Sequence, residues 1–328
     1  MRIAGWISLL TLLVGGATVA QTLPDGPLFM GFYETWTELP IASPEFTKLA
    51  QLPDSLDLVA IAFVKPSLTF DGVTLKSTGL EVPFDAPMLA KAIGALRKRN
   101  PKAKILLSVG GSGYNKQWPD YAPEQLLKLV KFLGADGVDL DYEPANPACA
   151  HIRLNDQSTI NCGSEQEWVR IIRMTRAVFP RPYVVTAQAW SVGAYGVGDF
   201  ARDIPPSPWT GSMLWLAKTP EAKELDVVAV MAYDSGPSFD PERAMAAYRA
   251  VWSGPLLMGI EVPSAESKEL PTPVNRIKRL ANVESKDAKG GILLYAVTEE
   301  VKAGPSLNRP DGELAAKAIC EGLGRKGC

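Results

Sequence analysis

Eight short apolar runs, rich in β-branched residues, recur along the chain and set the strongest limit on its fold. The runs show little alternation between apolar and polar residues, which is typical of strands buried on both faces of a parallel sheet. Segments of helical character follow them. The runs occupy residues 28–34, 56–63, 104–110, 137–143, 183–190, 226–233, 255–262 and 291–297.

Six of the intervening segments carry clear helix signals. The segment that begins at Asp85 ends in basic residues, which suit the negative end of a helix. Gly134 closes the next segment, and Ser164 with Glu167 has the spacing of a capping box. The connection at residues 205–218 is the least regular. The predicted helices span residues 85–100, 122–134, 164–179, 240–252, 272–283 and 311–324.

This alternation predicts an α/β fold, a single (β/α)8 TIM barrel. The chain has 328 residues, a length that such barrels often use as one domain. An open doubly wound sheet is the alternative, but it would need a glycine-rich phosphate loop after its first strand. Residues 31–40 (GFYETWTELP) are aromatic and acidic instead. We also expect a short hairpin at residues 67–76, turning on Asp71-Gly72, after the second strand.

The fourth run, GVDLDYE, interleaves three acids with apolar residues. Residues two apart on a strand point to the same side, so Asp139, Asp141 and Glu143 face one way. In a barrel they point inward and climb toward the C-terminal mouth, where barrel enzymes keep their chemistry. Stacked carboxylates cannot all ionise cheaply, so at least one should hold a proton at neutral pH. A protonated acid beside an ionised one is what glycosidic cleavage requires.

Other chemistries fit the sequence less well. An EF-hand calcium loop needs glycine at its sixth position, where Pro144 stands when the count begins at Asp139. The single histidine, His151, argues against histidine-rich zinc sites and Ser-His-Asp catalysis. A formal net charge of −2 gives no footprint for nucleic acid or for an anionic membrane. We therefore expect no metal, no cofactor and no nucleic-acid partner.

Four motifs, in order along the chain, resemble family 18 glycoside hydrolases, the chitinase family. DGVDLDYE at residues 136–143 matches the DxxDxDxE signature of that family at every specified position. SVGG ends the third run, MAYD ends the sixth, and GFYETW is similar to the family's opening on the first strand. The resemblance covers the chain from about Leu28 to about Gly324, the extent of the predicted barrel.

The resemblance implies a retaining, substrate-assisted mechanism. Glu143 protonates the leaving glycosidic oxygen and later activates water, while the substrate's own acetamido oxygen attacks. Asp141 stabilises the resulting oxazolinium ion, and Asp139 shares a proton with Asp141. Tyr233 hydrogen-bonds the acetamido carbonyl. The substrate-binding candidates, from the resemblance, strand parity and aromatic character together, are Phe32, Phe63, Gly110, Gly111, Met231, Asp234, Gln188, Trp190 and Tyr295.

Aromatic side chains at strand ends supply flat apolar faces for sugar rings. Trp36, Trp118 and Trp190 are candidate platforms, with burial in the core as the alternative for each. Tyr295 stands near the end of the eighth run, where the family usually has a tryptophan, so affinity or substrate choice is expected to differ. Glu261 is a second acid near the mouth for which the resemblance implies no role.

The gap between residues 262 and 291 leaves no room for the small α+β domain that many processive family members insert there. An open, shallow cleft and endo-acting cleavage of β-1,4-linked N-acetylglucosamine glycans are therefore expected. Two other functions remain open. One is an endo-β-N-acetylglucosaminidase that cuts the chitobiose core of N-glycans. The other is a chitin-binding lectin, although family lectins typically lose the acid at the position of Glu143.

Residues 1–20 carry an early positive charge, an apolar middle and small residues before Gln21. This pattern predicts a secretory signal peptide, with the catalytic domain at residues 21–328. An uncleaved anchor is less consistent, because the apolar core at residues 7–14 is too short to span a bilayer. Export to an oxidising compartment is consistent with the presence of four cysteines. Their grouping suggests the disulfides 149–162 and 320–328, although four cysteines allow three pairings. We expect a secreted monomer with no membrane contact after cleavage. The cysteines are Cys149, Cys162, Cys320 and Cys328.

Overall fold

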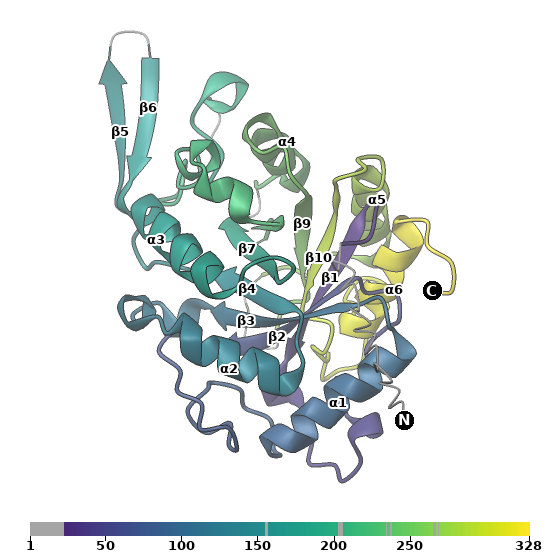
Figure 1. The fold of residues 1–328 in the computed structure, drawn as a ribbon. Coiled ribbons are helices and arrows are strands. Elements are labelled where there is room, and N and C mark those ends of the chain that lie inside the picture. Colours follow the sequence, from purple (N-terminus) through teal and green to yellow (C-terminus); the bar gives the residue numbers. More distant parts are fainter. Residues whose placement is uncertain are drawn as a thin grey trace, which may run out of the picture.

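The computed structural model describes residues 23–154, 157–202, 206–233, 235–236, 238–264, 267 and 269–328. The predicted signal peptide lies outside these ranges. Within them, the eight apolar runs form one closed barrel of parallel strands (Figure 1). Its strands are β1 (Leu28–Glu34), β2 (Leu58–Val64), β3 (Lys104–Gly110), β4 (Gly137–Asp141), β7 (Val184–Trp190), β8 (Val227–Met231), β9 (Leu256–Glu261) and β10 (Gly291–Tyr295).

The barrel closes because β1 pairs with both β2 and β10. The first and last barrel strands are therefore neighbours, and side chains from the two ends of the sequence meet at the same mouth. Two buried layers result: a small apolar set fills the barrel interior, and a much larger set lies between the strands and the surrounding helices. The predicted (β/α)8 fold is confirmed.

Six α-helices cover the barrel in the described ranges (Figure 1). Asp85, Asp240 and Asp311 cap three of them, since each side chain accepts a backbone hydrogen bond from the first turn. Gly134 ends another in the left-handed conformation, with φ of 69°. The helices are α1 (Ala86–Arg99), α2 (Pro123–Leu133), α3 (Gly163–Val178), α4 (Pro241–Val251), α5 (Val274–Glu284) and α6 (Gly312–Gly322).

Two of the seven connections between successive barrel strands hold only short 3-10 turns among the described residues. The connection after β1 contains η1 (Thr35–Thr37) and η2 (Pro44–Phe46). The connection after β7 contains η5 (Gly198–Phe200), η6 (Leu216–Lys218) and η7 (Glu221–Glu224). The second connection is the one that the sequence left least regular. It includes Pro206 and Pro208, which lack the backbone donor that a continuous helix needs.

The hairpin predicted at residues 67–76 is wrong, because this segment is a loop without strands. The Asp71 carboxylate accepts bonds from the backbone N–H groups of Val73 at 2.8 Å and Thr74 at 2.7 Å. Such local side-chain bonds compete with a strand ladder. Phe70 on this loop packs edge-on against Phe132 of α2, which anchors the loop to the outer core.

A hairpin occurs instead after β4, where β5 (Cys149–Leu154) pairs with β6 (Gln157–Cys162) and projects away from the barrel (Figure 1). One disulfide joins Cys149 to Cys162 at its base. The other joins Cys320, in the last turn of α6, to Cys328 beyond the helix. The suggested pairing is thus the one in the structure.

The capping box predicted at Ser164 and Glu167 is wrong by two residues, because Cys162 and Glu165 form it. Helix α3 begins at Gly163, and Glu165, not Glu167, accepts the bond from the backbone of Cys162. Glu165 also accepts from the backbone N–H groups of Trp215 and Leu216, which ties the start of α3 to the loop after β7.

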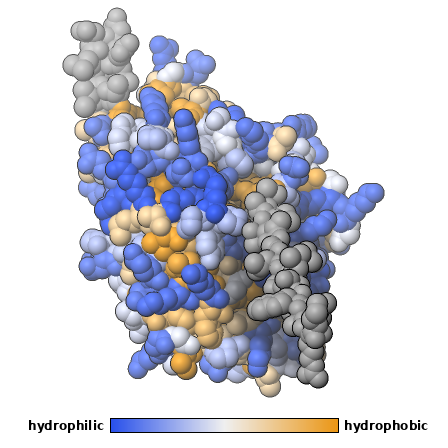
Figure 2. Space-filling view, viewed as in Figure 1, coloured by the Kyte–Doolittle hydropathy of each residue, from blue (hydrophilic) through white to orange (hydrophobic). Residues whose placement is uncertain are grey.

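The face in Figure 2 is largely hydrophilic, with apolar residues gathered in its middle and lower part. None of the helices among the described residues is long and apolar enough to cross a membrane.

The connection between β9 and β10 holds the single helix α5 and loops among its described residues. The described residues between β9 and β10 contain no additional α+β domain. Val262 and Ser264, at the start of this connection, line the cleft at the mouth of the barrel.

Candidate active site

The acidic strand β4 has the predicted alternation. Asp139 and Asp141 are buried on the inner side, whereas Val138, Leu140 and Tyr142 pack in the outer core. Tyr142 lies edge-on to both Trp118 and Trp168, with ring centroids 5.4 Å apart in each pair. The strand ends at Asp141, so Glu143 lies on the segment just beyond it, at the mouth.

Asp139 is the deepest of the three acids and is fully buried. Its carboxylate accepts hydrogen bonds from Ser108 on β3 at 2.8 Å, and from Thr186 at 2.5 Å and Gln188 at 2.8 Å on β7. Burial raises the pKa of Asp139, and these three bonds oppose the rise by favouring the ionised form. Both neighbouring strands therefore fix this side chain.

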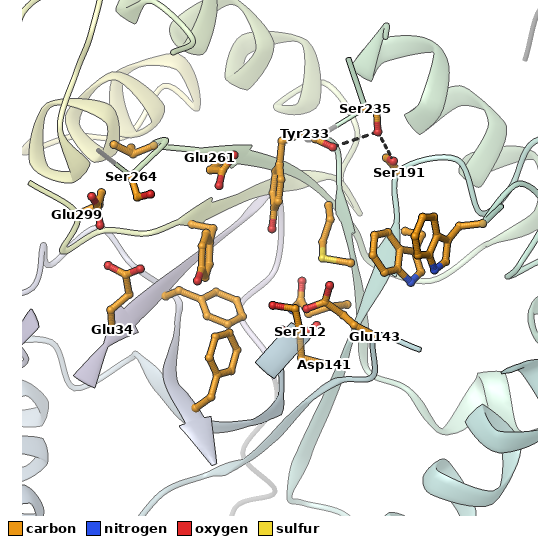
Figure 3. A pocket seen from close by; sticks show the side chains of 18 of the residues that line it. Glu34, Ser112, Asp141, Glu143, Ser191, Tyr233, Ser235, Glu261, Ser264 and Glu299 are labelled. Atoms are coloured by element: carbon orange, nitrogen blue, oxygen red, sulfur yellow. Dashed lines mark hydrogen bonds between the residues drawn. The ribbon is translucent and has the colours of Figure 1, made fainter. Parts of the chain in front are cut away.

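Asp141 lies above Asp139 and is 4% exposed. Its Oδ1 atom is buried and makes no hydrogen bond among the described residues. Burial raises the pKa of Asp141 well above its usual range, and the charges of Glu143 and Asp139 raise it further. In Figure 3, Asp141 and Glu143 lie side by side, and Tyr233 points toward them from across the pocket. A buried acceptor without a partner is thus available to a ligand here.

Two glycines from the SVGG motif hold Asp141 in place. A Cβ on Gly110 would lie 2.1 Å from the backbone oxygen of Asp141, and its φ is 113°. The backbone N–H of Gly111 donates to the same oxygen at 2.9 Å. Only a residue without a side chain fits at Gly110, where strands β3 and β4 approach each other. Neither glycine is among the described residues that line the cleft, although Ser112 is.

Tyr233 lies two residues beyond the end of β8. Burial raises the pKa of Tyr233 well above its usual range, and the charge of Asp141 adds to this, so the hydroxyl keeps its proton. Its ring stacks on Tyr295 with centroids 6.4 Å apart. Ser235 donates to the backbone oxygen of Tyr233 at 3.1 Å and bonds Ser191 at 2.5 Å (Figure 3). This chain of bonds links Tyr233 to the loop after β7.

A cleft of about 890 Å³ opens above these residues. Aromatic rings form part of its lining: Phe32 lies 5.9 Å from Phe63 and 5.5 Å from Tyr295, and Trp36 stacks on Phe63 at 5.9 Å. Predicted residues that line the cleft are Phe32, Phe63, Asp141, Glu143, Gln188, Trp190, Met231, Tyr233, Glu261 and Tyr295. Predicted Asp234 lies outside the described residues.

The three candidate tryptophans have different environments. Trp36 is 44% exposed and lines the cleft, whereas Trp118 is 1% exposed in the core. Trp190 lines the cleft and stacks on Trp209, with centroids 4.4 Å apart. Trp209, which the sequence analysis missed, donates to the backbone oxygen of Pro144 at 3.2 Å, next to Glu143. Loop residues of this kind carry no strand periodicity that would reveal them.

Glu34 and Glu299 also line the cleft and were not predicted. Burial raises the pKa of Glu34 to about 8, and the neighbouring Glu299 contributes to this rise. Glu34 could have been found by parity, because it lies two residues after Phe32 on β1. Among the described residues, no group of three or more His, Cys, Asp or Glu side chains could hold a metal ion.

Stability should fall with rising pH because of Glu34. Below its ordinary pKa of 4.5 the carboxyl is protonated in both states; as the pH rises toward about 8, only the unfolded chain releases the proton. At about 1.4 kcal/mol per pKa unit, the loss is at most about 5 kcal/mol. Urea unfolding at about pH 5 and about pH 9 should therefore show a smaller loss for Glu34→Gln. An equal loss in both proteins would contradict a protonated Glu34.

Gly259→Ala should lower activity by displacing Tyr233. A Cβ on Gly259 would lie 2.4 Å from the backbone oxygen of Val230 and 2.9 Å from Cε1 of Tyr233, so the end of β8 must move. We expect kcat/KM to fall about tenfold or more, since a misplacement of about 1 Å can cost 100-fold. Gly113→Ala, which has no atom within 4 Å of its new Cβ, is the control. Equal activities of the two variants, measured on one substrate with folding checked by circular dichroism, would refute this role.

Comparison with known proteins agrees with the geometry. The sequence profile described as "Glycosyl hydrolases family 18" matches residues 28–247. A chitinase of Plasmodium falciparum (isolate 3D7) is 30% identical over 129 residues, which cover 36% of this chain and 32% of that protein. The match thus spans about a third of the length of that curated relative.

Solved structures share the fold. A family 18 chitinase from Pseudoalteromonas aurantia has a TM-score of 0.61 and 19% identity, covering 90% of this chain and 100% of that one. A mutant family 18 chitinase from Cycas revoluta, in complex with (GlcNAc)4, has a TM-score of 0.59 and 13% identity, covering 90% and 99%. The family profile spans well over half of the chain and includes Asp139, Asp141 and Glu143. The chain therefore belongs to glycosyl hydrolase family 18.

Proposed function

We propose that this protein is a secreted, endo-acting hydrolase of β-1,4-linked N-acetylglucosamine glycans. One observation carries the proposal: the buried, unpartnered Oδ1 of Asp141 lies beside Glu143 in a cleft, with the Tyr233 hydroxyl facing it (Figure 3). An acceptor, an acid and a donor thus converge on one space. These are the groups that an acetamido sugar needs if its own carbonyl oxygen is to react.

In the first step, Glu143 donates its proton to the glycosidic oxygen as the bond to the anomeric carbon breaks. The acetamido oxygen of the same sugar attacks that carbon and forms an oxazolinium ion. Tyr233, which stays protonated, donates a hydrogen bond to the acetamido oxygen and positions it. No side-chain carboxylate attacks the sugar, which departs from the usual two-carboxylate scheme.

Asp141 stabilises the positive charge of this ion and accepts the acetamido N–H at its Oδ1 atom. The Asp139–Asp141 pair holds a proton in the free protein, because burial disfavours charge on both groups. Transfer of the proton to Asp139 leaves Asp141 ionised when charge develops on the sugar. In the second step, Glu143 takes a proton from water, which attacks the anomeric carbon and restores the original configuration.

The open cleft supports internal cleavage of soluble chains. Tyr295 provides a smaller stacking surface than a tryptophan, and it packs between Phe32 and Tyr233. Secretion, with residues 21–328 as the catalytic domain, is supported by the two disulfides, which form in oxidising compartments.

Product analysis on a panel of acetylated glycans tests the proposal. The panel holds chitooligosaccharides and a high-mannose glycoprotein, and mass spectrometry identifies the products. We expect internal cleavage of the chitooligosaccharides. Cleavage of the glycoprotein alone would identify an endo-β-N-acetylglucosaminidase, and binding without any cleavage would identify a lectin; either result overturns the proposal.

Thiazoline analogues of the oxazolinium ion should inhibit the protein competitively. They mimic the five-membered ring that Asp141 and Tyr233 are proposed to hold, and analogues of reactive species bind about 100-fold tighter than substrates or better. Inhibition constants should be measured for wild type and for Tyr233→Phe, which loses one donor. Indifference of the wild type to thiazolines would argue against participation of the acetamido group.

A further inference from the structure

Strand β7 and the loop after it form one end of the cleft. In the barrel order, β10, β9 and β8 separate β7 from β1 on one side, and β4, β3 and β2 separate them on the other. The two strands therefore face each other across the mouth. In Figure 3, Ser191, the first residue after β7, lies on the other side of Asp141 and Glu143 from Glu34, which ends β1. The cleft thus extends from the acids in two directions, toward β1 and toward β7.

Gln188 on β7 carries a buried acceptor at this end. It is 2% exposed and lines the cleft. Its Nε2 atom donates to Asp139 at 2.8 Å, whereas its Oε1 atom is buried and makes no hydrogen bond among the described residues. Buried amide oxygens are seldom left unpaired in folded proteins. Because the bond to Asp139 fixes the amide group, Oε1 is held in place for a donor on a ligand.

Two stacked indole rings lie on the same side of the cleft. Trp190 follows Gln188 by two residues on β7 and therefore shares its inward face. Its ring stacks on Trp209 with centroids 4.4 Å apart, and both residues line the cleft. The indole N–H of Trp209 donates to the backbone oxygen of Pro144, which ties the pair to the residue after Glu143. The buried Nε1 atom of Trp190 makes no hydrogen bond within the described ranges, so an unused donor lies beside the acid.

This end of the cleft is uncharged in the part that the structure describes. The lining residues that β7 and its loop contribute there are apolar, hydroxyl or amide residues. Flat apolar rings with a few fixed polar groups are a surface suited to one face of a neutral sugar ring. The β7 end therefore has the chemistry of a sugar-binding surface.

We propose that Gln188, Trp190 and Trp209 form a subsite for the leaving-group sugar, the ring on the reducing-end side of the cleaved bond. This inference rests on the proposed function. The acetamido ring lies beside Asp141, and Glu143 gives its proton to the oxygen that joins this ring to the next one. Because the indole pair is held next to Glu143, the ring that leaves with this oxygen meets β7.

Recognition there needs no further chemical step. A hydroxyl or acetamido N–H of the leaving ring donates to Oε1 of Gln188, and the indole N–H of Trp190 donates to an oxygen of the same ring. One face of the ring packs against the indole pair. The subsite thus selects a neutral sugar as the leaving group, and it raises the affinity for glycans that extend past the cleaved bond.

Binding measured without turnover tests the subsite. In a Glu143→Gln background, calorimetry compares a chitooligosaccharide, which spans both sides of the cleaved bond, with chitobiose thiazoline, which ends at the anomeric carbon. Adding Trp209→Leu should weaken the oligosaccharide about tenfold, or about 1.4 kcal/mol, and change the thiazoline less than about twofold. Gln188→Met, which removes the acceptor, should lower the ratio of the two affinities in the same direction.

Trp215→Leu is the matched control. Trp215 lies on the same loop, is 42% exposed and is not among the described residues that line the cleft. Its backbone N–H makes the bond to Glu165, so the substitution keeps that bond and should leave both affinities unchanged. Trp209→Phe keeps a flat ring but loses the bond to Pro144, and it should retain most of the affinity for the oligosaccharide.

Two outcomes overturn the subsite. Equal weakening of both probes by Trp209→Leu would mean that Trp209 only positions the acids, and unchanged affinities would mean that the glycan does not reach β7. If no variant binds the thiazoline, Trp215→Leu is the reference, and equal losses of oligosaccharide affinity in Trp209→Leu and Trp215→Leu overturn the subsite.

Hydrolysis of the oligosaccharide by wild type is a separate readout of the proposed function. Weakening confined to Trp209→Leu, without hydrolysis by wild type, would leave the subsite standing as a sugar site and the proposed function refuted. Hydrolysis without such weakening would do the reverse.

Discussion

Glu143→Gln should abolish hydrolysis while leaving oligosaccharide binding largely intact. Glutamine has the same shape but cannot give a proton to the glycosidic oxygen or take one from water. A positioned acid or base contributes about 10²- to 10⁴-fold to a rate, and Glu143 is proposed to act in both steps. We therefore expect kcat to fall about 10⁴-fold, measured as product release from a chitooligosaccharide under saturating substrate.

Two controls make this result specific. Glu124→Gln makes the same chemical change on the outer surface of the barrel, at an exposed residue, and should retain full activity. Calorimetric titration of Glu143→Gln with the oligosaccharide should give a Kd close to the KM of the wild type. Turnover of Glu143→Gln near that of wild type would mean that the acid has been assigned wrongly.

Asp141→Asn should produce the second largest loss of activity. The amide cannot carry the negative charge that offsets the oxazolinium ion, although it fills the same space. Removal of one group that stabilises a charged transition state costs about 10²- to 10³-fold in kcat. The loss should appear mainly in kcat, because the charge on the sugar develops only as the bond breaks. Steady-state kinetics on a chitooligosaccharide measures both constants.

Stability separates this effect from misfolding. Asp141 is 4% exposed and has no hydrogen bond at Oδ1, so a neutral side chain removes a cost of burial. The melting temperature of Asp141→Asn should equal or exceed that of wild type at neutral pH. Asp120→Asn, at an exposed aspartate in the loop after β3, is the control for the same substitution. An active Asp141→Asn variant, or an inactive one that has lost stability, would contradict the role assigned to Asp141.

Strand parity predicted much of this site, because alternate side chains on each barrel strand point into the barrel or out toward the helices. In β4, the inward Asp139 and Asp141 and the outward Val138 and Leu140 follow from an alternation of two. The same rule applied to β1 would have found Glu34, which shares its face with Phe32. Aromatic lining was predictable for Tyr295, which ends β10, and for Phe63, which is next to last on β2.

Strand periodicity could not predict contacts between residues that are distant in sequence, or the positions of loop residues. Glu34 and Glu299 are far apart in sequence and meet only because β1 pairs with β10. Trp209 belongs to an irregular loop, where its contact with Trp190 depends on packing rather than on period. The loop after β2 has turn chemistry at Asp71 that resembles a hairpin, yet side-chain bonds close it locally. Patterns therefore predicted strands and their faces, whereas loops needed the structure.

The stereochemistry of the first product tests the central claim most directly. Proton NMR spectra, recorded immediately after wild-type protein is mixed with an N-acetylated chitooligosaccharide, show which anomer forms before mutarotation. Attack by the acetamido oxygen followed by water predicts the β-anomer, with configuration retained. Initial appearance of the α-anomer would require a single direct displacement by water and would contradict the account.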